Sequence, residues 1–207
     1  LAVHRHDGAG GDIWIFESGR GTMSRLTFDA TQDNSSPIWS PDGTRIAFGS
    51  RRNNKWGIYV KPADGTGSDE LLVESDATKE PMSWSADGKF IVYSLNGNSS
   101  DLWVLPLTGD RKPFPILQTR FAERWPQVSP DGEWIAYDSN ETGRPEIYIK
   151  PFPNGPGKWQ VSTNGGYFAR WRRDGKELYF MTANGPGKIM AADIRTAGSA
   201  VQAGVPK

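Results

Sequence analysis

The sequence predicts an all-β fold made of repeated four-stranded antiparallel sheets, and three observations lead to this prediction. A segment with an aromatic residue, a tight Asp-Gly turn and an apolar strand occurs four times, anchored at Asp42, Asp87, Asp131 and Asp174. These aspartates are 45, 44 and 43 residues apart, a period typical of propellers and solenoids. The chain also has 24 glycines and 15 prolines, which suit short strands joined by turns. No 3.6-residue apolar periodicity persists, so we expect a β-propeller and not a helical solenoid.

The first complete repeat shows the expected order of strands within one blade. Residues 38–40 and 45–50 form a hairpin around Pro41-Asp42-Gly43, where proline presets φ and glycine accepts a positive φ. A polar segment follows, then a third strand over residues 57–61 and a fourth over residues 70–73. These strands are rich in β-branched and aromatic residues, so one period is predicted to form one four-stranded blade.

The same pattern predicts how the 207 residues are divided. We expect a single domain over residues 1–207, with a partial blade over 1–28 and blades over about 29–74, 75–118, 119–162 and 163–207. The partial blade lacks its innermost strand, and the last strand, within Ala197–Val205, is weakly marked. Propellers seal their ring by pairing strands from both ends. About five blades are therefore predicted, either in an imperfectly closed ring or in a six-bladed or larger ring whose other blades lie outside this sequence.

Residues that recur at fixed distances from the anchoring aspartates are predicted to be structural. Large aromatic side chains would fill the wedge between neighbouring blades, whereas an exposed aromatic could stack on a ligand instead. The aspartates would bond to their own turns. The aromatic positions are Trp39, Trp84 and Trp171, with Val128 as the exception, and Phe48, Tyr93, Tyr137 and Phe180. The predicted structural residues of the repeat are Trp39, Asp42, Gly43, Trp84, Asp87, Gly88, Asp131, Gly132, Trp171, Asp174 and Gly175.

Composition excludes several classes of partner. Lys and Arg total 24, as do Asp and Glu, so the net charge gives no long-range attraction for nucleic acid. No apolar run reaches the roughly 20 residues that span a bilayer, and no basic segment precedes an apolar one at the N-terminus. We therefore expect neither membrane insertion nor a signal peptide in this stretch. The absence of cysteine excludes disulfides and leaves both a periplasmic and a cytoplasmic location open.

The sequence shows no recognisable catalytic motif. It has no Gly-x-Ser-x-Gly elbow, no His-Glu-x-x-His and no Cys-His pair. The two histidines, His4 and His6, alternate onto one face of a strand and could hold a metal, yet no third ligand stands near them in the sequence. Residues 154–158 and 184–188 contain Gly-Pro-Gly-Lys but lack the spacing of a P-loop. We predict no catalytic residue, no metal site and no cofactor, and therefore not an enzyme.

Recognition is predicted on the face where the connecting segments differ between repeats. The segments that join second to third strands, and one blade to the next, all emerge there, whereas the opposite face has uniform Asp-Gly turns. Variable loops on a rigid scaffold commonly carry binding sites. The same charges are equally consistent with a solvated rim. The candidate binding residues are Arg51, Arg52, Glu80, Glu123, Arg124, Arg144 and Arg170, the last of them facing the channel.

Connecting segments give a more specific signal than the common Trp-Ser-Pro-Asp-Gly repeat. They include residues 141–148 (Glu-Thr-Gly-Arg-Pro-Glu-Ile-Tyr), Pro151-Phe-Pro153 and residues 159–163 (Trp-Gln-Val-Ser-Thr). With these motifs the chain resembles the WD-repeat-like (WD40-like) β-propellers of the TolB-like family, most closely the propeller region C-terminal to bacterial Ser/Thr protein kinase domains. The resemblance implies a bacterial sensor or interaction module of six or more blades, without catalysis. Val128 and Arg172-Arg173 depart from the repeat, and no kinase residue can be carried over.

Three functions follow as hypotheses. The first is a non-catalytic module that binds a protein, a peptide or a small ligand through its loop-rich face. The second is a propeller that accompanies a peptidase-like or lyase-like enzyme, and the third is a structural fragment without independent activity. An unsealed ring would also favour self-association, because its free strand edges can pair with another chain.

Overall fold

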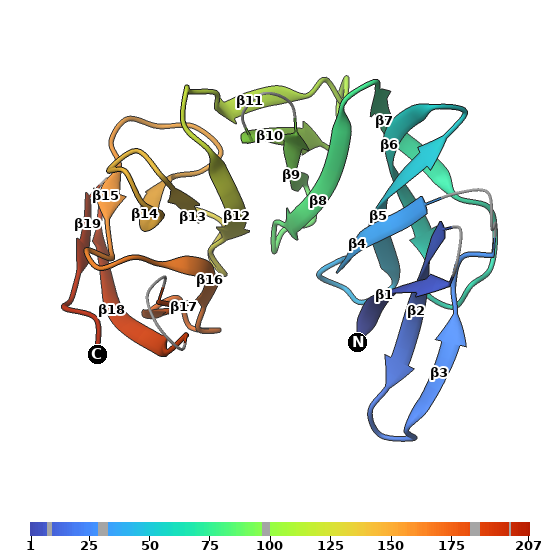
Figure 1. Ribbon diagram of the computed structural model, residues 1–207, viewed down its shortest axis with the longest axis horizontal. Coiled ribbons are helices and arrows are strands. Elements are labelled where there is room, and N and C mark those ends of the chain that lie inside the picture. Colours follow the sequence, from blue (N-terminus) through green and yellow to red (C-terminus); the bar gives the residue numbers. More distant parts are fainter. Residues whose placement is uncertain (8–9, 29–32, 97–99, 183–186, 199) are drawn as a thin grey trace.

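The computed structural model describes residues 1–7, 10–28, 33–96, 100–182, 187–198 and 200–207. All regular secondary structure in these residues is β-strand. The strands form five sheets that follow one another along an open arc (Figure 1). The first sheet has three strands, β1 (Ala2–Asp7), β2 (Gly10–Glu17) and β3 (Thr22–Arg25). The described part of the chain contains no helix that could cross a membrane.

Each of the other four sheets has four antiparallel strands in chain order. This arrangement confirms the predicted all-β fold of four-stranded blades. The second sheet is β4 (Asp33–Trp39), β5 (Arg45–Arg52), β6 (Lys55–Pro62) and β7 (Glu70–Ser75), and the third is β8 (Thr78–Trp84), β9 (Phe90–Asn96), β10 (Ser100–Pro106) and β11 (Phe114–Leu117). The fourth is β12 (Glu123–Val128), β13 (Trp134–Ser139), β14 (Glu146–Pro151) and β15 (Trp159–Gln160), and the fifth is β16 (Tyr167–Trp171), β17 (Glu177–Met181), β18 (Ile189–Ala197) and β19 (Ala200–Ala203).

Several strands are longer than the sequence predicts. The inner strand of the second sheet begins at Asp33 and not at Ile38. The polar segment between β5 and β6 shrinks to a two-residue turn, because Asn53 and Asn54 both adopt a positive φ, 50° and 61°. Turns of this kind match the twist of the flanking strands. Many residues expected in loops therefore lie on strands.

The anchoring aspartates close the inner hairpins through local hydrogen bonds. The Ser40 hydroxyl donates to Asp42 Oδ1 at 2.6 Å, the Thr44 N–H donates to the same oxygen at 3.0 Å, and the Arg45 N–H donates to Ser40 Oγ at 2.9 Å. These bonds, led by the Ser40 hydroxyl, lower the pKa of Asp42 to about 2. The third and fourth sheets repeat the arrangement. In the fifth sheet Arg172 replaces the serine and pairs with Asp174 and Glu177, each at 2.8 Å.

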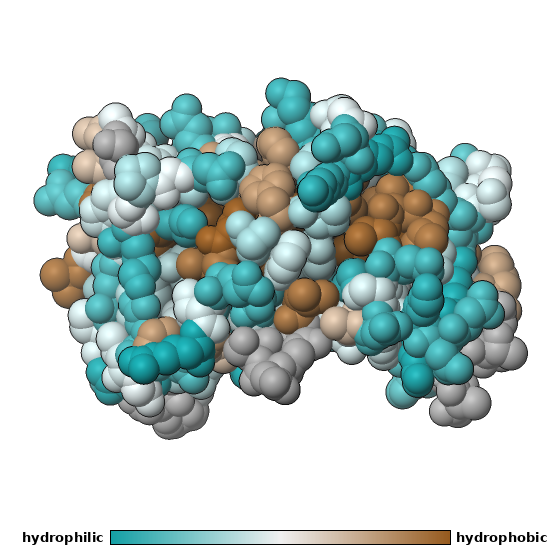
Figure 2. Space-filling model, turned by 90° about the horizontal axis from the view of Figure 1, so that it is seen from above, coloured by the Kyte–Doolittle hydropathy of each residue, from teal (hydrophilic) through white to brown (hydrophobic). Residues whose placement is uncertain are grey.

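Every apolar core lies between two neighbouring sheets. Ile58 of the second sheet packs in one cluster with Tyr93 of the third, and Leu102 of the third packs with Tyr137 of the fourth. The buried aromatic column consists of Phe48, Tyr93, Tyr137 and Phe180. The second predicted column, Trp39, Trp84, Val128 and Trp171, is only half-buried and packs against these clusters. Figure 2 shows apolar side chains in a band between polar rims on one side of the arc.

Side chains also join the inner strands of neighbouring sheets. The Val128 N–H donates to Ser83 Oγ at 3.1 Å, and Gln127 Nε2 donates to the Met82 carbonyl at 3.1 Å. Trp171 Nε1 in turn donates to the Gln127 carbonyl at 3.0 Å. Strands β8, β12 and β16 are thereby held at fixed positions relative to one another.

The two ends of the arc do not meet in a common sheet. Among the described strands, β1 pairs with β2 and the strands β16 to β19 pair only within their own sheet. Figure 1 shows the chain termini on either side of the opening. Ile189 is 76% exposed and Val205 is 90% exposed at this end of the chain. How the ring is completed stays a prediction.

The two aromatic columns should differ in their contribution to stability. We expect Phe48→Ala to lower the free energy of unfolding by about 3–5 kcal/mol, because it removes a fully buried ring between two sheets. Trp39→Ala should cost less, because its indole is already partly in water. Urea unfolding of both variants measures the difference, and an equal or larger loss for Trp39→Ala would contradict the assignment of the main packing role to the Phe48 column.

Candidate functional site at the inner strands

The inner strands share an irregularity at one position. Strands β4, β8, β12 and β16 each shift register about six residues before the anchoring aspartate. The bulge residue has a positive φ at Ser36 (52°), Trp125 (51°) and Phe168 (57°), whereas the third sheet has Pro81, whose ring forbids this conformation. For a bulky residue a left-handed backbone costs about 1–2 kcal/mol. Such strain persists where its surroundings enforce it, and it is concentrated at functional sites.

Two of these strained residues bring their rings into contact. The ring centroids of Trp125 and Phe168 are 4.7 Å apart with the planes inclined by 55°, and Tyr167 lies 6.1 Å from Phe168. We call Trp125, Tyr167 and Phe168 the aromatic cluster. It joins β12 to β16 across two sheets, and Phe168 is 39% exposed. The bulges thus present aromatic surface to solvent where the sheets meet.

A buried carboxyl group supports the aromatic cluster from β13. Asp138 lies opposite Arg124 in the β12–β13 register and is 2% exposed. Burial raises the pKa of Asp138 to about 7, against the opposing effects of the Arg124 guanidinium and of a hydrogen bond from the Phe168 N–H. Oδ1 of Asp138 has no hydrogen-bond partner within the described residues. The buried carboxyl group therefore lies beside the strained backbone of Phe168.

Four of the predicted binding residues are exposed, namely Arg144 and three arginines that lie on strands. Arg51 is near the end of β5, Arg124 is on β12 beside Trp125, and Arg170 is on β16 two residues after Phe168. Arg124 and Arg170 thus flank the residues of the aromatic cluster in the sequence. Arg51 belongs to the second sheet, on the other side of the arc (Figure 1).

Arg144 and the three remaining predicted binding residues are engaged within the fold. Arg52 pairs with Asp69 and lies 3.7 Å over the Tyr59 ring. Arg144 Nε is 2.8 Å from Glu146 Oε1, at the edge of a shallow hollow of about 330 Å³. Two further predicted residues lie on inner strands and not in loops: Glu80 is half-buried on β8, and Glu123 on β12 is buried. The Thr119 hydroxyl donates to Glu123 at 2.6 Å, and burial raises the pKa of this carboxyl group.

Sequence reasoning missed the aromatic cluster and Asp138. An alignment on the anchoring aspartates places Ser36, Pro81, Trp125 and Phe168 at one position, where two large rings stand out. The same alignment shows Asp138 where the other repeats have Gly49, Ser94 and Met181. Both signals were present in the sequence. The positive φ of the bulge was not, because it depends on the pairing of two strands.

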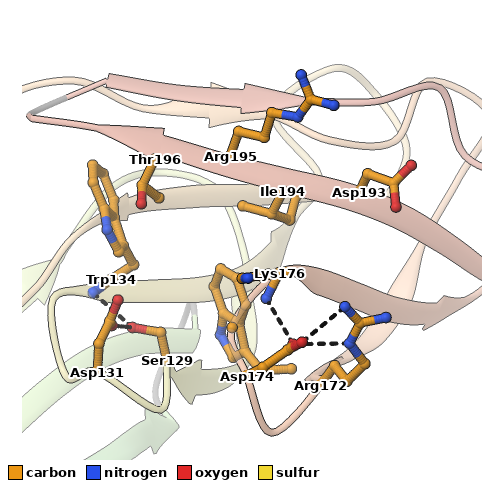
Figure 3. Close-up of a pocket in the computed structure, with 12 residues that line it drawn as sticks. Ser129, Asp131, Trp134, Arg172, Asp174, Lys176, Asp193, Ile194, Arg195 and Thr196 are labelled. Carbon is orange, nitrogen blue, oxygen red and sulfur yellow. Dashed lines mark hydrogen bonds and ion pairs between the residues drawn. The ribbon is translucent and has the colours of Figure 1, made fainter.

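A second hollow lies at the opposite ends of β12 and β16, between the Asp-Gly turns and β18 (Figure 3). Its volume is about 560 Å³. In Figure 3, Asp174 lies between Arg172 and Lys176, and Arg195 points away from the turns. The Asp174 carboxylate is held by the Arg172 guanidinium, which helps to lower its pKa to about 2. Arg172 and Asp174 thus serve the turn of the fifth sheet, and the aromatic cluster is the stronger candidate site.

Comparison with known proteins places the fold. No family model matches the chain. The crystal structure of TolB from Acinetobacter baumannii matches all of the chain with a TM-score of 0.77 and 20% identity, and a putative TolB from Agrobacterium tumefaciens matches 95% of it with a TM-score of 0.76 and 20% identity. The chain has a TolB-like β-propeller fold.

Two curated proteins show similarity in sequence. Tricorn protease homolog 1 of Streptomyces coelicolor is 30% identical over 102 residues, which are 47% of this chain. A TolB homolog of Chlorobium luteolum is 28% identical over 132 residues, which are 62% of this chain. The chain spans only 10% and 29% of these two proteins, and it spans 52% and 74% of the two TolB structures.

The raised pKa of Asp138 should make stability depend on pH. Between about pH 4 and 7 the folded protein retains a proton that the unfolded chain releases, so the free energy of unfolding falls as pH rises through this window. The asparagine of Asp138→Asn keeps an oxygen that can accept a hydrogen bond from the Phe168 N–H. Its side chain cannot ionise. We expect this variant to lose much less stability than the parent between pH 5 and 8 in urea unfolding.

Asp193→Asn, at an exposed carboxyl group of the last sheet, is the matched control and should behave like the parent. Glu123→Gln should remove part of the same pH dependence, because burial raises the Glu123 pKa as well. An Asp138→Asn variant with the parent's pH dependence would show that Asp138 ionises normally in the folded protein.

Proposed function

We propose that this chain is a binding module whose aromatic cluster, flanked by Arg124 and Arg170, receives an acidic peptide segment of a partner protein. One observation carries the proposal: Trp125 and Phe168 keep a strained backbone although neither ring belongs to a buried core cluster, and Phe168 is 39% exposed while Trp125 is half-buried. Core packing at this level is supplied by other residues, including Tyr137 and Phe180. The strain is therefore best explained by what the rings present to a ligand.

The residue types around the aromatic cluster favour this class of ligand. Exposed aromatic and arginine side chains are enriched among residues that dominate protein interfaces. Guanidinium groups bind carboxylates through paired, charge-assisted hydrogen bonds, and Arg124 and Arg170 are both exposed. An extended segment with an apolar side chain and nearby carboxylates would use both features. The TolB-like fold supports the general role of a propeller that binds a partner, and it does not specify the ligand.

A selection from a random 12-residue peptide library tests the proposal. Enriched peptides should be acidic and should contain an apolar residue. We expect Trp125→Ala and Phe168→Ala each to weaken binding of an enriched peptide by at least about 10-fold, because truncation of an interface hot-spot residue costs roughly 2 kcal/mol or more. Arg124→Gln should weaken binding and reduce its dependence on salt. Fluorescence anisotropy with a labelled peptide measures all three effects.

Arg195→Gln is the matched control, because Arg195 lies beside the hollow on the opposite face. This variant should change the affinity by less than about 2-fold, compared with the roughly 10-fold loss expected when a hot-spot residue is removed. Loss of binding in this control, with normal binding by the cluster variants, would place recognition on the Asp-Gly face and refute the proposal.

Similarity to tricorn protease homologs favours a second candidate, a propeller that accompanies a peptidase. In that case the aromatic cluster would contact peptide substrates on their way to a catalytic domain elsewhere. The resemblance to propellers attached to Ser/Thr kinase domains suggests instead that binding at the cluster regulates an attached kinase. The complete reading frame of the gene distinguishes these two roles. A hydrolase domain in it would support the peptidase role, and a kinase domain would support the regulatory role.

A further inference from the structure

Three potential metal ligands converge where the first two sheets meet. His4 and His6 lie two residues apart on β1, so their side chains project from the same face. Asp33 begins β4, the inner strand of the next sheet. One ligand atom from each of the three residues lies within 4.8 Å of the other two. The packing of two sheets thus supplies the third ligand that the sequence does not show near the histidines.

The ring of His6 is already oriented for coordination. Its Nδ1 lies 2.9 Å from the carbonyl oxygen of Gly10. A carbonyl oxygen can only accept, so Nδ1 carries the proton and Nε2 keeps its lone pair. Metal-binding histidines are held in this way by a hydrogen bond from the second ring nitrogen. The centroids of the two imidazole rings are 5.4 Å apart.

Asp33 and Gly11 complete the site in two independent ways. Oδ1 of Asp33 is buried and has no hydrogen-bond partner among the residues that the structure describes. Gly11 lies on β2 beside this oxygen, and a Cβ atom there would stand 2.0 Å from His4 Nε2 and 2.9 Å from Asp33 Oδ1. His4 Nε2 and Asp33 Oδ1 therefore occupy the space over the Gly11 Cα that the side chain of any other residue would fill.

We propose that His4, His6 and Asp33 bind a divalent transition-metal ion of the Zn²⁺ type. Two imidazoles and one carboxylate form a ligand set used for Zn²⁺ and Fe²⁺, and it leaves coordination positions open for water or a further ligand. Bonds of about 2.0–2.2 Å require ligand atoms about 3.3 Å apart, so binding draws the three side chains together by roughly 1 Å. Both histidines are exposed and can make this adjustment. Arg51, opposite Asp33 in the β4–β5 register, is exposed and can extend into solvent.

The experiment titrates the chain with ZnCl₂, and in parallel with CoCl₂, while the imidazole signals are followed by NMR. The chain has only two histidines, so every imidazole signal belongs to the site. We expect one ion per chain, with both imidazoles shifted by Zn²⁺ and both broadened by Co²⁺. Calorimetry with ZnCl₂ gives the affinity. His4→Gln, His6→Gln and Asp33→Asn should each lower it by at least about 10-fold.

Gly11→Ala tests the geometry without removing a ligand and should abolish binding. Its control is Gly19→Ala in the turn of the same sheet, where an added Cβ meets nothing within 4 Å. Asp193→Asn controls for the loss of an exposed carboxylate. If Gly11→Ala disturbs the sheet, the Zn²⁺ affinity of Asp33→Asn alone tests the proposed site. The proposal would be overturned if the parent chain bound no Zn²⁺, or if Asp33→Asn bound Zn²⁺ with unchanged affinity. The second result would show that the ion is held only by a chance pair of surface histidines.

Discussion

Within the part of the chain that the structure describes, no sheet has an apolar core of its own, and the rest of the structure depends on this constraint. Each cluster of buried side chains draws on two neighbouring sheets, as with Ile13 and Phe48, or Leu178 and Ala136. A sheet on its own would leave both faces of its central strands in water. The order of the sheets along the arc is therefore fixed by the same contacts that stabilise each of them. Hydrogen bonds such as the one from Trp171 Nε1 to the Gln127 carbonyl also fix how neighbouring sheets are oriented relative to each other.

This rigid arrangement explains how strain can be retained at the aromatic cluster. A bulge in one strand could relax, but Trp125 lies on β12, which is linked to β8 and to β16, and Phe168 lies on β16, which is linked to β12. Their hairpins are closed at one end by the Asp131 and Asp174 turns, and Asp138 contacts the Phe168 backbone from the neighbouring sheet. A buried acid is itself costly. Ser36 has the same positive φ without a ring, so the bulge belongs to the repeat. The features that point to a role in recognition are the large rings at this position and the buried acid beside them.

The sequence predicted the fold because the signals for it are local. A turn of Asp-Gly, the apolar strand after it and the 43- to 45-residue period can all be read from single segments. The site could be predicted only in part, because it depends on contacts between sheets. Arg124 and Arg170 were identified by charge and position, but the Trp125–Phe168 contact and the approach of Asp33 to His4 join residues of different sheets. Arg52 and Glu123 are engaged with Asp69 and Thr119, and these contacts cannot be read from the residue types alone.

The most direct measurement of the central claim compares glycine and alanine at position 168. In an ordinary strand alanine is more stable than glycine by roughly 0.5–1 kcal/mol. At the positive φ of Phe168 the order should reverse, so that Phe168→Gly is more stable than Phe168→Ala by about 1 kcal/mol. At the neighbouring Tyr167, whose backbone is extended in β16, alanine should remain the more stable residue. A more stable alanine at both positions would show that the bulge is unstrained, and would contradict the claim that strain is retained at the aromatic cluster.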